Sequence, residues 1–321
     1  MKSQEYNNTL ENILNKIHLD SSYENWIQNF SLNLTDIWKE KSASDLIRFI
    51  DNKQSNSAIV IGAGPSLIKN NHLELLSKSN YRGTIICTDR ILASVLKAGV
   101  TPDKFNKFYV ITIDTAQIIK NFYKDKIIKK YANKINGIFT TVTHPDTISN
   151  AKTLGIKIHW VHALIDYDEG KKSFNQMSAL MVRAKRPKGL PAIQTGGNVG
   201  TSAWFIAWRI LKCKIVCFIG MDHSWSENDS WHSMARHCNV PINMNKKSQI
   251  FTQLFPRVYN PEFDTICILD PIFQYYSNAF KDFIQRSTSK VKTINATQGG
   301  CIFGKDIKCI SFKEFLRTYS K

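Results

Sequence analysis

What this sequence lacks narrows its class before any motif is considered. Its 321 residues contain no run of 18 or more apolar residues, the length that a transmembrane helix needs. The chain begins with the polar stretch Met-Lys-Ser-Gln-Glu-Tyr, which does not match a secretory signal. Its seven cysteines are an odd number and several stand in apolar runs, which favours reduced thiols packed in a core. We therefore expect a cytoplasmic protein with no membrane partner.

Several catalytic and metal-binding motifs are also missing. There is no G-x-x-x-x-G-K-[ST] loop and no G-x-S-x-G elbow, so neither a P-loop NTPase nor a serine hydrolase of the α/β type is expected. His223, His232, His237 and Cys238 stand close together in the sequence, but no Cys-x-x-Cys pair completes a structural zinc pattern. A zinc site is not expected either.

Acidic residues are few relative to basic ones. The 43 Lys and Arg against 26 Asp and Glu leave a formal net charge of +17, which favours anionic partners. The basic residues are dispersed and no nucleic-acid-binding motif is present, so we expect a nucleotide and a small-molecule acceptor as partners rather than DNA or RNA. Homo-oligomerisation stays open.

The most informative motif that is present lies at residues 57–67. A β-branched apolar run ends in Gly62, Gly64, Pro65 and Ser66, which predicts a strand, a tight turn and the start of a helix. The free N–H groups of such a helix start attract a phosphate. Leu67 replaces the third glycine of the dinucleotide fingerprint, which disfavours NAD and FAD. A phosphate-binding turn and an ordinary strand-to-helix turn both remain open at this point.

The apolar pattern divides the chain into two parts. Residues 1–55 have apolar side chains at helical spacing, such as Leu10, Ile13 and Ile17, and predict an N-terminal helical extension. Residues 56–321 alternate strand and helix signals, which predicts an α/β, Rossmann-like domain: a mostly parallel sheet with helices on both faces. Strands are expected at 57–61, 83–88, 107–113, 137–142, 156–161, 214–219, 264–269, 291–294 and 306–310. Helices are expected at 66–78, 90–98, 116–132, 146–153, 197–211, 271–286 and 311–319.

Two stretches break this alternation. The chain after Leu164 is polar and basic as far as the second glycine turn, and is predicted to be a loop. Residues 222–262 are predicted to be a long irregular lid or substrate loop.

Aspartates follow three of the predicted strands. Asp89, Asp114 and Asp222 would meet at one edge of a parallel sheet, and carboxylate oxygens are ligands that Mg²⁺ prefers. Asp114 and Asp222 are the preferred pair for the metal and for catalysis. Asp89 also fits a helix N-cap or a hydrogen bond to a ribose hydroxyl.

A second glycine turn and two histidines complete the candidate site. Gly196, Gly197 and Asn198 precede a predicted helix and repeat the pattern of an anion-binding turn. His223 follows Asp222 directly and is a candidate general acid or base, as is His144. A purely structural role for either histidine stays open.

Short motifs along the chain occur in the order found in the MptE-like proteins, and on them the chain resembles that family over about residues 57–316. These motifs are Ile-Gly-Ala-Gly-Pro-Ser-Leu (61–67), Cys-Thr-Asp-Arg-Ile-Leu (87–92), Gly-Val-Thr-Pro-Asp (99–103), Ile-Asp (113–114), Gly-Gly-Asn-Val-Gly-Thr-Ser-Ala (196–203), Ile-Gly-Met-Asp-His-Ser (219–224) and Asn-Ala-Thr-Gln-Gly-Gly (295–300). The family is typified by an archaeal 6-hydroxymethyl-7,8-dihydropterin pyrophosphokinase, and is distantly related to sialyltransferases and flagellin-modifying glycosyltransferases.

This resemblance implies a transferase that moves a diphosphate from ATP to a reduced pterin with Mg²⁺ and releases AMP. It implies that Gly62, Gly64, Pro65 and Ser66 bind ATP phosphate, and that Asp114 and Asp222 bind Mg²⁺. The second glycine turn, residues 196–198, would line the opposite wall. The alternative is a glycosyltransferase that uses a CMP-activated sialic-type sugar, because both branches use the first turn for a nucleotide phosphate.

Overall fold

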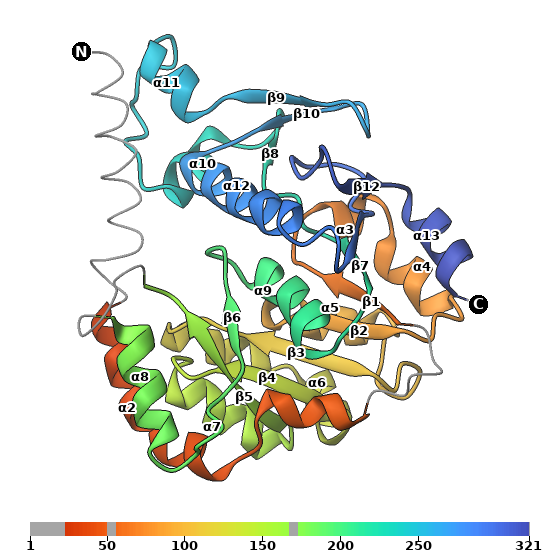
Figure 1. Cartoon of the computed structure of the whole chain (residues 1–321). Helices are drawn as coiled ribbons and strands as arrows, with labels where there is room; N and C mark the ends of the chain where they lie inside the picture. Colours follow the sequence, from red (N-terminus) through yellow and green to blue (C-terminus); the bar gives the residue numbers. More distant parts are fainter. Residues whose placement is uncertain (1–22, 50–55, 167–172, 321) are drawn as a thin grey trace.

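The computed structural model describes residues 23–49, 56–166 and 173–320 (Figure 1). Its centre is a sheet of nine strands in the order β12-β11-β7-β1-β2-β3-β4-β5-β6, and all strand pairings in it are parallel. The strands are β1 Ser57–Ile61, β2 Thr84–Thr88, β3 Phe108–Thr112, β4 Asn136–Thr140, β5 Lys157–Leu164, β6 Ala192–Gln194, β7 Ile215–Ile219, β11 Lys292–Asn295 and β12 Ile307–Cys309.

Helices cover both faces of this sheet, as the sequence predicted. The five residues of β1 are all buried, and alternate side chains enter different cores: Ile59 and Ile61 one, Ala58 and Val60 the other. The first face packs against α2 Tyr23–Lys39, α4 His72–Lys78, α5 Leu92–Lys97, α6 Lys126–Tyr131, α7 Pro145–Leu154, α8 Phe174–Arg183 and α13 Phe312–Tyr319. The second packs against the 3₁₀ helix Ala43–Phe49, α9 Val199–Phe205 with the π-helical segment Ile206–Ile210, and α12 Pro271–Gln285.

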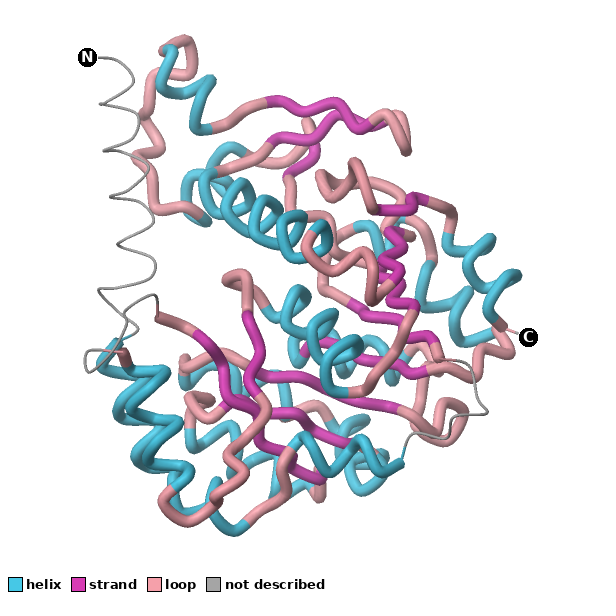
Figure 2. Tube along the Cα trace, viewed as in Figure 1, coloured by secondary structure: helices cyan, strands magenta, loops and turns pink. Residues whose placement is uncertain are grey.

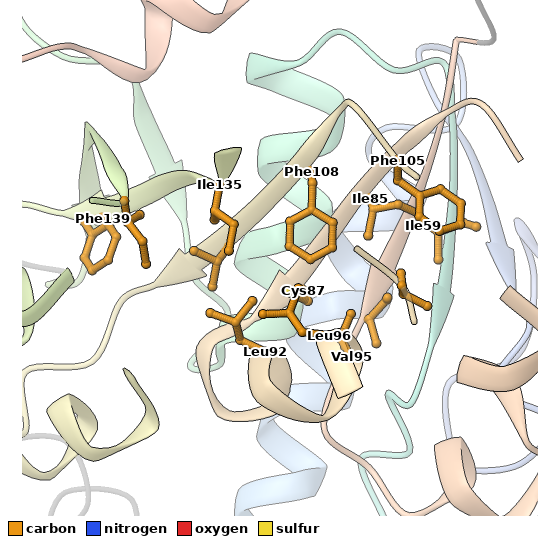
Figure 3. Packing of buried hydrophobic residues seen from close by; sticks show 14 of the residues in the cluster. Ile59, Ile85, Cys87, Leu92, Val95, Leu96, Phe105, Phe108, Ile135 and Phe139 are labelled. Atoms are coloured by element: carbon orange, nitrogen blue, oxygen red, sulfur yellow. The ribbon is translucent and has the colours of Figure 1, made fainter. Parts of the chain in front are cut away.

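Figure 3 shows the first core where α5 meets the sheet. Leu92, Val95 and Leu96 of this helix lie beside Cys87 and Phe108 of the sheet, and all five side chains are almost fully buried. The spacing of the three helix residues puts them on one face, which explains why this short helix forms here.

The strand order reverses next to β1. The chain builds outward from β1 through β2 to β6, then crosses back to place β7 on the other side of β1, followed by β11 and β12. The loops after β1 and β7 therefore lie side by side at this point, and the chain leaves them toward opposite ends of the sheet. In open parallel sheets, ligands bind at such a reversal, beyond the carboxyl ends of the strands.

Helix α2 is an integral part of this domain rather than an appendage. Asn29 Nδ2 donates to the carbonyls of Thr115 (3.1 Å) and Val142 (3.0 Å), in the loops that follow β3 and β4. Asn33, one turn later, donates to the carbonyl of Thr143 at 2.7 Å. These buried amides hold the loops at the carboxyl edge of the sheet. The predicted helical positions 10–17 lie outside the described residues.

The prediction of a polar, basic loop from Leu164 to the second glycine turn is wrong for part of this stretch. Helix α8 occupies Phe174–Arg183, and its residues Phe174, Ser178 and Val182 are buried at a spacing of one helical turn. The polar and charged residues around them hid this pattern in the sequence. Strand β6, with only three residues, was also missed.

Residues 222–262 are not irregular either, which corrects the second loop prediction. They contain β8 Trp225–Ser226, α10 Trp231–His237, α11 Gln249–Leu254 and β9 Arg257–Asn260. Strands β8 and β9 pair with β10 Thr265–Ile268 in a separate antiparallel sheet, and the segment has its own small core with Met234, Leu254 and Ile272. The strand predicted at 264–269 forms, but in this small sheet. Figure 2 shows α12 between this small unit and the rest of the molecule.

Some predicted helices are divided. The helix expected at 66–78 is split into α3 Ser66–Lys69 and α4, because Asn71 adopts a left-handed conformation with φ of 51°. The helix expected at 116–132 is a 3₁₀ helix, Gln117–Tyr123, followed by α6. None of the helices in the described ranges has the length and apolar character needed to cross a membrane.

Candidate functional site

The first glycine turn is bound closely to the loop that follows β7. The amide of Gly62 donates to the carbonyl of Ile219 at 2.9 Å, and that of Gly64 to the carbonyl of Gly220 at 2.8 Å. A Cβ on Gly62 would lie 2.3 Å from the Gly220 oxygen, and one on Gly64 only 1.9 Å from Oδ2 of Asp222. Glycine is required at both positions because the two backbones approach too closely for a side chain.

Asp222 connects the two loops through its side chain. Ser66 Oγ donates to Oδ2 of Asp222 at 2.8 Å, and the amide of Ser66 also binds this carboxylate. Burial raises the pKa of Asp222 to about 6, while the Ser66 hydroxyl, the Ser66 amide and the charge of Lys69 oppose the shift. Ser66 and Asp222, predicted for different ligands, are thus hydrogen-bonded to each other. Pro65 occupies the N-cap position of α3.

The motif at 295–300 supports Asp222 from behind. The amide of Cys301 donates to the Asp222 carbonyl at 3.0 Å. Gly300 has φ of 75°, and a Cβ there would lie 2.3 Å from the same carbonyl oxygen. Asn260 Nδ2 holds the Gly300 carbonyl at 2.7 Å. Loops after β1, β7 and β11 therefore converge on one aspartate.

Asp89 lies at the carboxyl end of β2, the strand next to β1. It begins the 3₁₀ helix Asp89–Ile91, and its Oδ1 accepts from the amide of Arg90 at 2.7 Å. Its buried Oδ2 has no partner with hydrogen-bond geometry among the described residues, although the Thr112 hydroxyl lies near enough to this carboxyl to act on its pKa. Burial raises the pKa of Asp89 to about 7, opposed by the Thr112 hydroxyl and the Arg90 amide and reinforced by the charge of Asp114. A buried carboxylate oxygen without a donor is suited to a ligand hydroxyl or a cation.

Asp114 follows β3 and is exposed. Its Oδ1 accepts from the amide of Ala116 at 2.9 Å, which fixes the carboxylate at the start of the loop. Its charge acts on Asp89, whereas the charged residue that acts on Asp222 is Lys69. Asp114 thus lies close enough to Asp89 for their charges to interact, and no such interaction with Asp222 is found among the described residues.

The second glycine turn lies under α12. Gly196 and Gly197 have φ of 55° and 80°, and a Cβ on Gly197 would lie 2.4 Å from the ring of Tyr276. Asn198 caps α9 by accepting from the Thr201 amide at 2.9 Å. This turn is formed as predicted, and its upper side is covered by an aromatic side chain.

His223 is enclosed by rings of α12. It lies 6.4 Å from the ring centre of Phe273, stacked, and 6.1 Å from that of Tyr276. Burial and the charge of Lys281 lower the pKa of His223 to about 3, so its imidazole is neutral at physiological pH. The other candidate histidine, His144, caps α7 by accepting from the Asp146 amide at 3.1 Å.

His237, named in the sequence only as part of a rejected zinc pattern, pairs beside these residues with Asp270, which the sequence did not single out. His237 Nδ1 lies 2.6 Å from Oδ2 of Asp270, which is fully buried and caps α12. Trp225 Nε1 donates to the same oxygen at 2.8 Å. The dipeptide Asp270-Pro271 signals a helix start, but the two residues that bind Asp270 are 33 and 45 positions away.

The described residues contain no group of three or more His, Cys, Asp or Glu side chains able to hold a metal ion. Mg²⁺ usually takes only one or two protein carboxylates together with substrate phosphates. The exposed carboxylate of Asp114 fits that mode of binding, whereas Asp222 is bound by Ser66 and would have to release it to act as the second ligand.

The open parallel sheet with helices on both faces defines an α/β protein, and in this class ligands bind beyond the carboxyl ends of the strands. A family model described as "6-hydroxymethylpterin diphosphokinase MptE-like" matches residues 28–228. The chain therefore belongs to the MptE-like family. The match begins inside α2 and ends after β8, so it includes a helix that the motif-based resemblance left out and excludes the 295–300 motif.

A solved structure supports the fold. The Maf glycosyltransferase of Magnetospirillum magneticum AMB-1 aligns with a TM-score of 0.50 and 13% identity, over 89% of this chain. The alignment spans 41% of the glycosyltransferase chain. No curated protein sequence matches. The family and this neighbour are both named for transferases.

Proposed function

We propose that this protein is a Mg²⁺-dependent diphosphotransferase that moves a diphosphate from ATP to the hydroxymethyl group of 6-hydroxymethyl-7,8-dihydropterin and releases AMP. The observation that carries the nucleotide part is Asp89 Oδ2, a buried and unpartnered acceptor directly after β2, the strand next to β1. The acceptor is inferred from the description of the family.

In this proposal a ribose hydroxyl of ATP donates a hydrogen bond to Oδ2 of Asp89. The phosphates extend from there toward Gly62, Gly64 and Ser66. Ser66 exchanges its carboxylate partner for a phosphate oxygen, because its hydroxyl and amide are suited to either anion. Lys69, whose charge already reaches Asp222, supplies positive charge on the same side.

Asp114 and Asp222 would hold Mg²⁺, with Asp89 as a neighbouring carboxylate. The ion would neutralise phosphate charge, which together with alignment is the main requirement of such transfers. Gly196, Gly197 and Asn198 form the wall on the α12 side.

The decisive experiment is an incubation of the full chain with ATP, Mg²⁺ and the reduced pterin. We expect AMP and the pterin diphosphate in equal amounts. Release of CMP from a CMP-activated acidic sugar, without AMP from the first mixture, would contradict the proposal and favour the glycosyltransferase alternative. The fold of the Maf glycosyltransferase makes that second mixture the relevant comparison.

The metal-binding residues are tested by Asp114→Asn and Asp222→Asn. We expect each variant to fold and to lose at least about 100-fold in kcat, since removal of a charge-stabilising group costs that much in comparable sites. Asp103→Asn is the matched control, because Asp103 pairs with Lys134 on the surface. Full activity in both test variants would remove these residues from the site.

A further inference from the structure

The His237–Asp270 pair has the geometry of a general base and its positioning carboxylate. Asp270 accepts three N–H groups: Oδ2 binds His237 Nδ1 at 2.6 Å and Trp225 Nε1 at 2.8 Å, and Oδ1 binds the Phe273 amide at 2.8 Å. With all three donors in place, Nδ1 of the neutral imidazole carries its proton toward Asp270, and Nε2 keeps its lone pair. No hydrogen bond to Nε2 is found within the described part of the chain.

Asp270 is buried and His237 is partly exposed, as a general base that meets its substrate from the solvent side requires. The side chain of Asp270 is fully buried, whereas that of His237 is 33% exposed. The carboxylate is therefore protected from water, and the imidazole can meet a ligand from the solvent side. His223, by contrast, is enclosed by rings and has an environment that disfavours its protonation.

The pair lies next to the candidate site. Its imidazole is 4.7 Å from the ring centre of Phe273, which in turn stacks on His223, the residue after Asp222. One turn further along α12, Tyr276 covers Gly197. In Figure 1, α10 meets the N-terminal part of α12, the helix that runs over the carboxyl edge of the main sheet. One helix thus connects the pair to the loop of Asp222 and to the second glycine turn.

We propose that His237, positioned by Asp270, is the general base that removes the proton of the acceptor hydroxyl. This inference rests on the proposed function and adds a catalytic residue to it. The hydroxymethyl oxygen bonds to the β-phosphorus of ATP as its proton passes to Nε2. The bond between that phosphorus and the oxygen bridging to the α-phosphorus breaks, and its electron pair leaves with AMP. The proton on His237 then returns to solvent, so atoms and charges balance.

The test compares wild type, His237→Ala and the control Arg236→Ala, whose side chain is exposed on the same helix. We expect kcat of His237→Ala to fall by about 100- to 10,000-fold, with the KM for ATP unchanged within a factor of about three, because the base acts on the acceptor alone. Added imidazole is expected to restore part of the rate. Arg236→Ala is expected to match wild type.

Asp270→Asn adds a test of positioning. An amide at this position donates rather than accepts on one side, so it favours the other tautomer of His237 and removes the lone pair from Nε2. We expect a loss of kcat that imidazole does not restore, since the ring is still in place.

The outcomes separate the two proposals. Wild type that releases no AMP from ATP and the reduced pterin overturns the proposed function, and this inference with it, whether or not CMP is released from the sugar nucleotide. Turnover by wild type together with an unchanged kcat in His237→Ala overturns the inference alone. A lower kcat in His237→Ala that follows a lower melting temperature, with no rescue by imidazole, also overturns it by assigning the pair a structural role.

Discussion

The loops after β1 and β7 differ from those after β2 and β3, although all four lie at the same edge of the sheet. The first pair is closely packed: a side chain on Gly62 or Gly64 would overlap with the β7 loop, and Asp222 is bound by Ser66. The second pair leaves Asp89 with an unpartnered oxygen and Asp114 exposed.

The close packing gives the first glycine turn a structural role of its own. The glycines at 62 and 64 are required by the approach of another backbone segment, whether or not a phosphate binds nearby. The acceptor that lacks a hydrogen bond at this edge of the sheet is Oδ2 of Asp89, which follows the neighbouring strand, β2. A nucleotide bound across both regions would have its phosphates at the loops after β1 and β7 and its sugar beside Asp89.

We expect Gly64→Ala to disrupt the packing between the loops after β1 and β7 most severely. The added Cβ would lie 1.9 Å from Asp222 Oδ2 and 2.8 Å from the Gly220 oxygen, so the two loops must separate. We expect the free energy of unfolding to fall by about 3 kcal/mol, measured by urea denaturation. Gly200→Ala is the control, because its Cβ would meet the flexible end of Met221 at 3.0 Å. Equal stability of the two variants would contradict the close packing described here.

The environment of Asp89 is tested by the pH dependence of the free energy of unfolding of the Asp89→Asn variant. Since burial raises the pKa of Asp89 from 3.8 to about 7, the folded state favours its protonated form, and the wild type loses this contribution as the pH rises through about 7. The asparagine variant has no such loss. We expect it to gain roughly 2 kcal/mol over wild type between pH 5 and pH 8, and to bind ATP more weakly. Parallel stability curves would show that the carboxylate is not held in a desolvated site.

The smallest change expected in this comparison is the shift that Asp114→Asn causes in the titration of Asp89. The negative charge of Asp114 raises the pKa of Asp89, so removing it should lower the pH at which Asp89 titrates, by less than about one unit. The titration is measured from the carboxyl carbon resonance of Asp89 in nuclear magnetic resonance spectra, with Asp103→Asn as the control. A shift in the control but not in Asp114→Asn would contradict the proximity of Asp114 to Asp89.

Much of the fold could be predicted from the sequence, for reasons visible in particular elements. Strand β1 is an unbroken β-branched and apolar run followed by glycines, and it forms at the predicted residues, Ser57–Ile61. Strand β6 and helix α8 were missed because one is too short and the other is largely polar. Of the three-stranded sheet only β10 was predicted, and its pairing with β8 and β9 was missed because these two strands are short and lie in a largely polar segment.

The candidate site could be predicted only in part. The strand-end rule brought Asp89, Asp114 and Asp222 to one edge, because parallel strands end on the same side. Which side chains contact one another at this edge depends on the conformation of the loops. The bond between Ser66 and Asp222 joins residues 156 positions apart, and the pair of His237 and Asp270 spans 33 positions. Nothing in the local sequence specifies either contact.

By itself, the sequence determined the parallel α/β architecture with its helical cover, since alternating hydrophobic periods dictate which segments become strands and which become helices. It also determined that glycine turns and aspartates gather at one edge. The tertiary structure was needed to show that α2 packs into the domain and that Asp222 is bound by the first turn while Asp89 keeps a free oxygen. It was also needed to show that Phe273 of α12 contacts both His237 and His223. These features depend on burial and on contacts between distant segments, which a linear pattern does not contain.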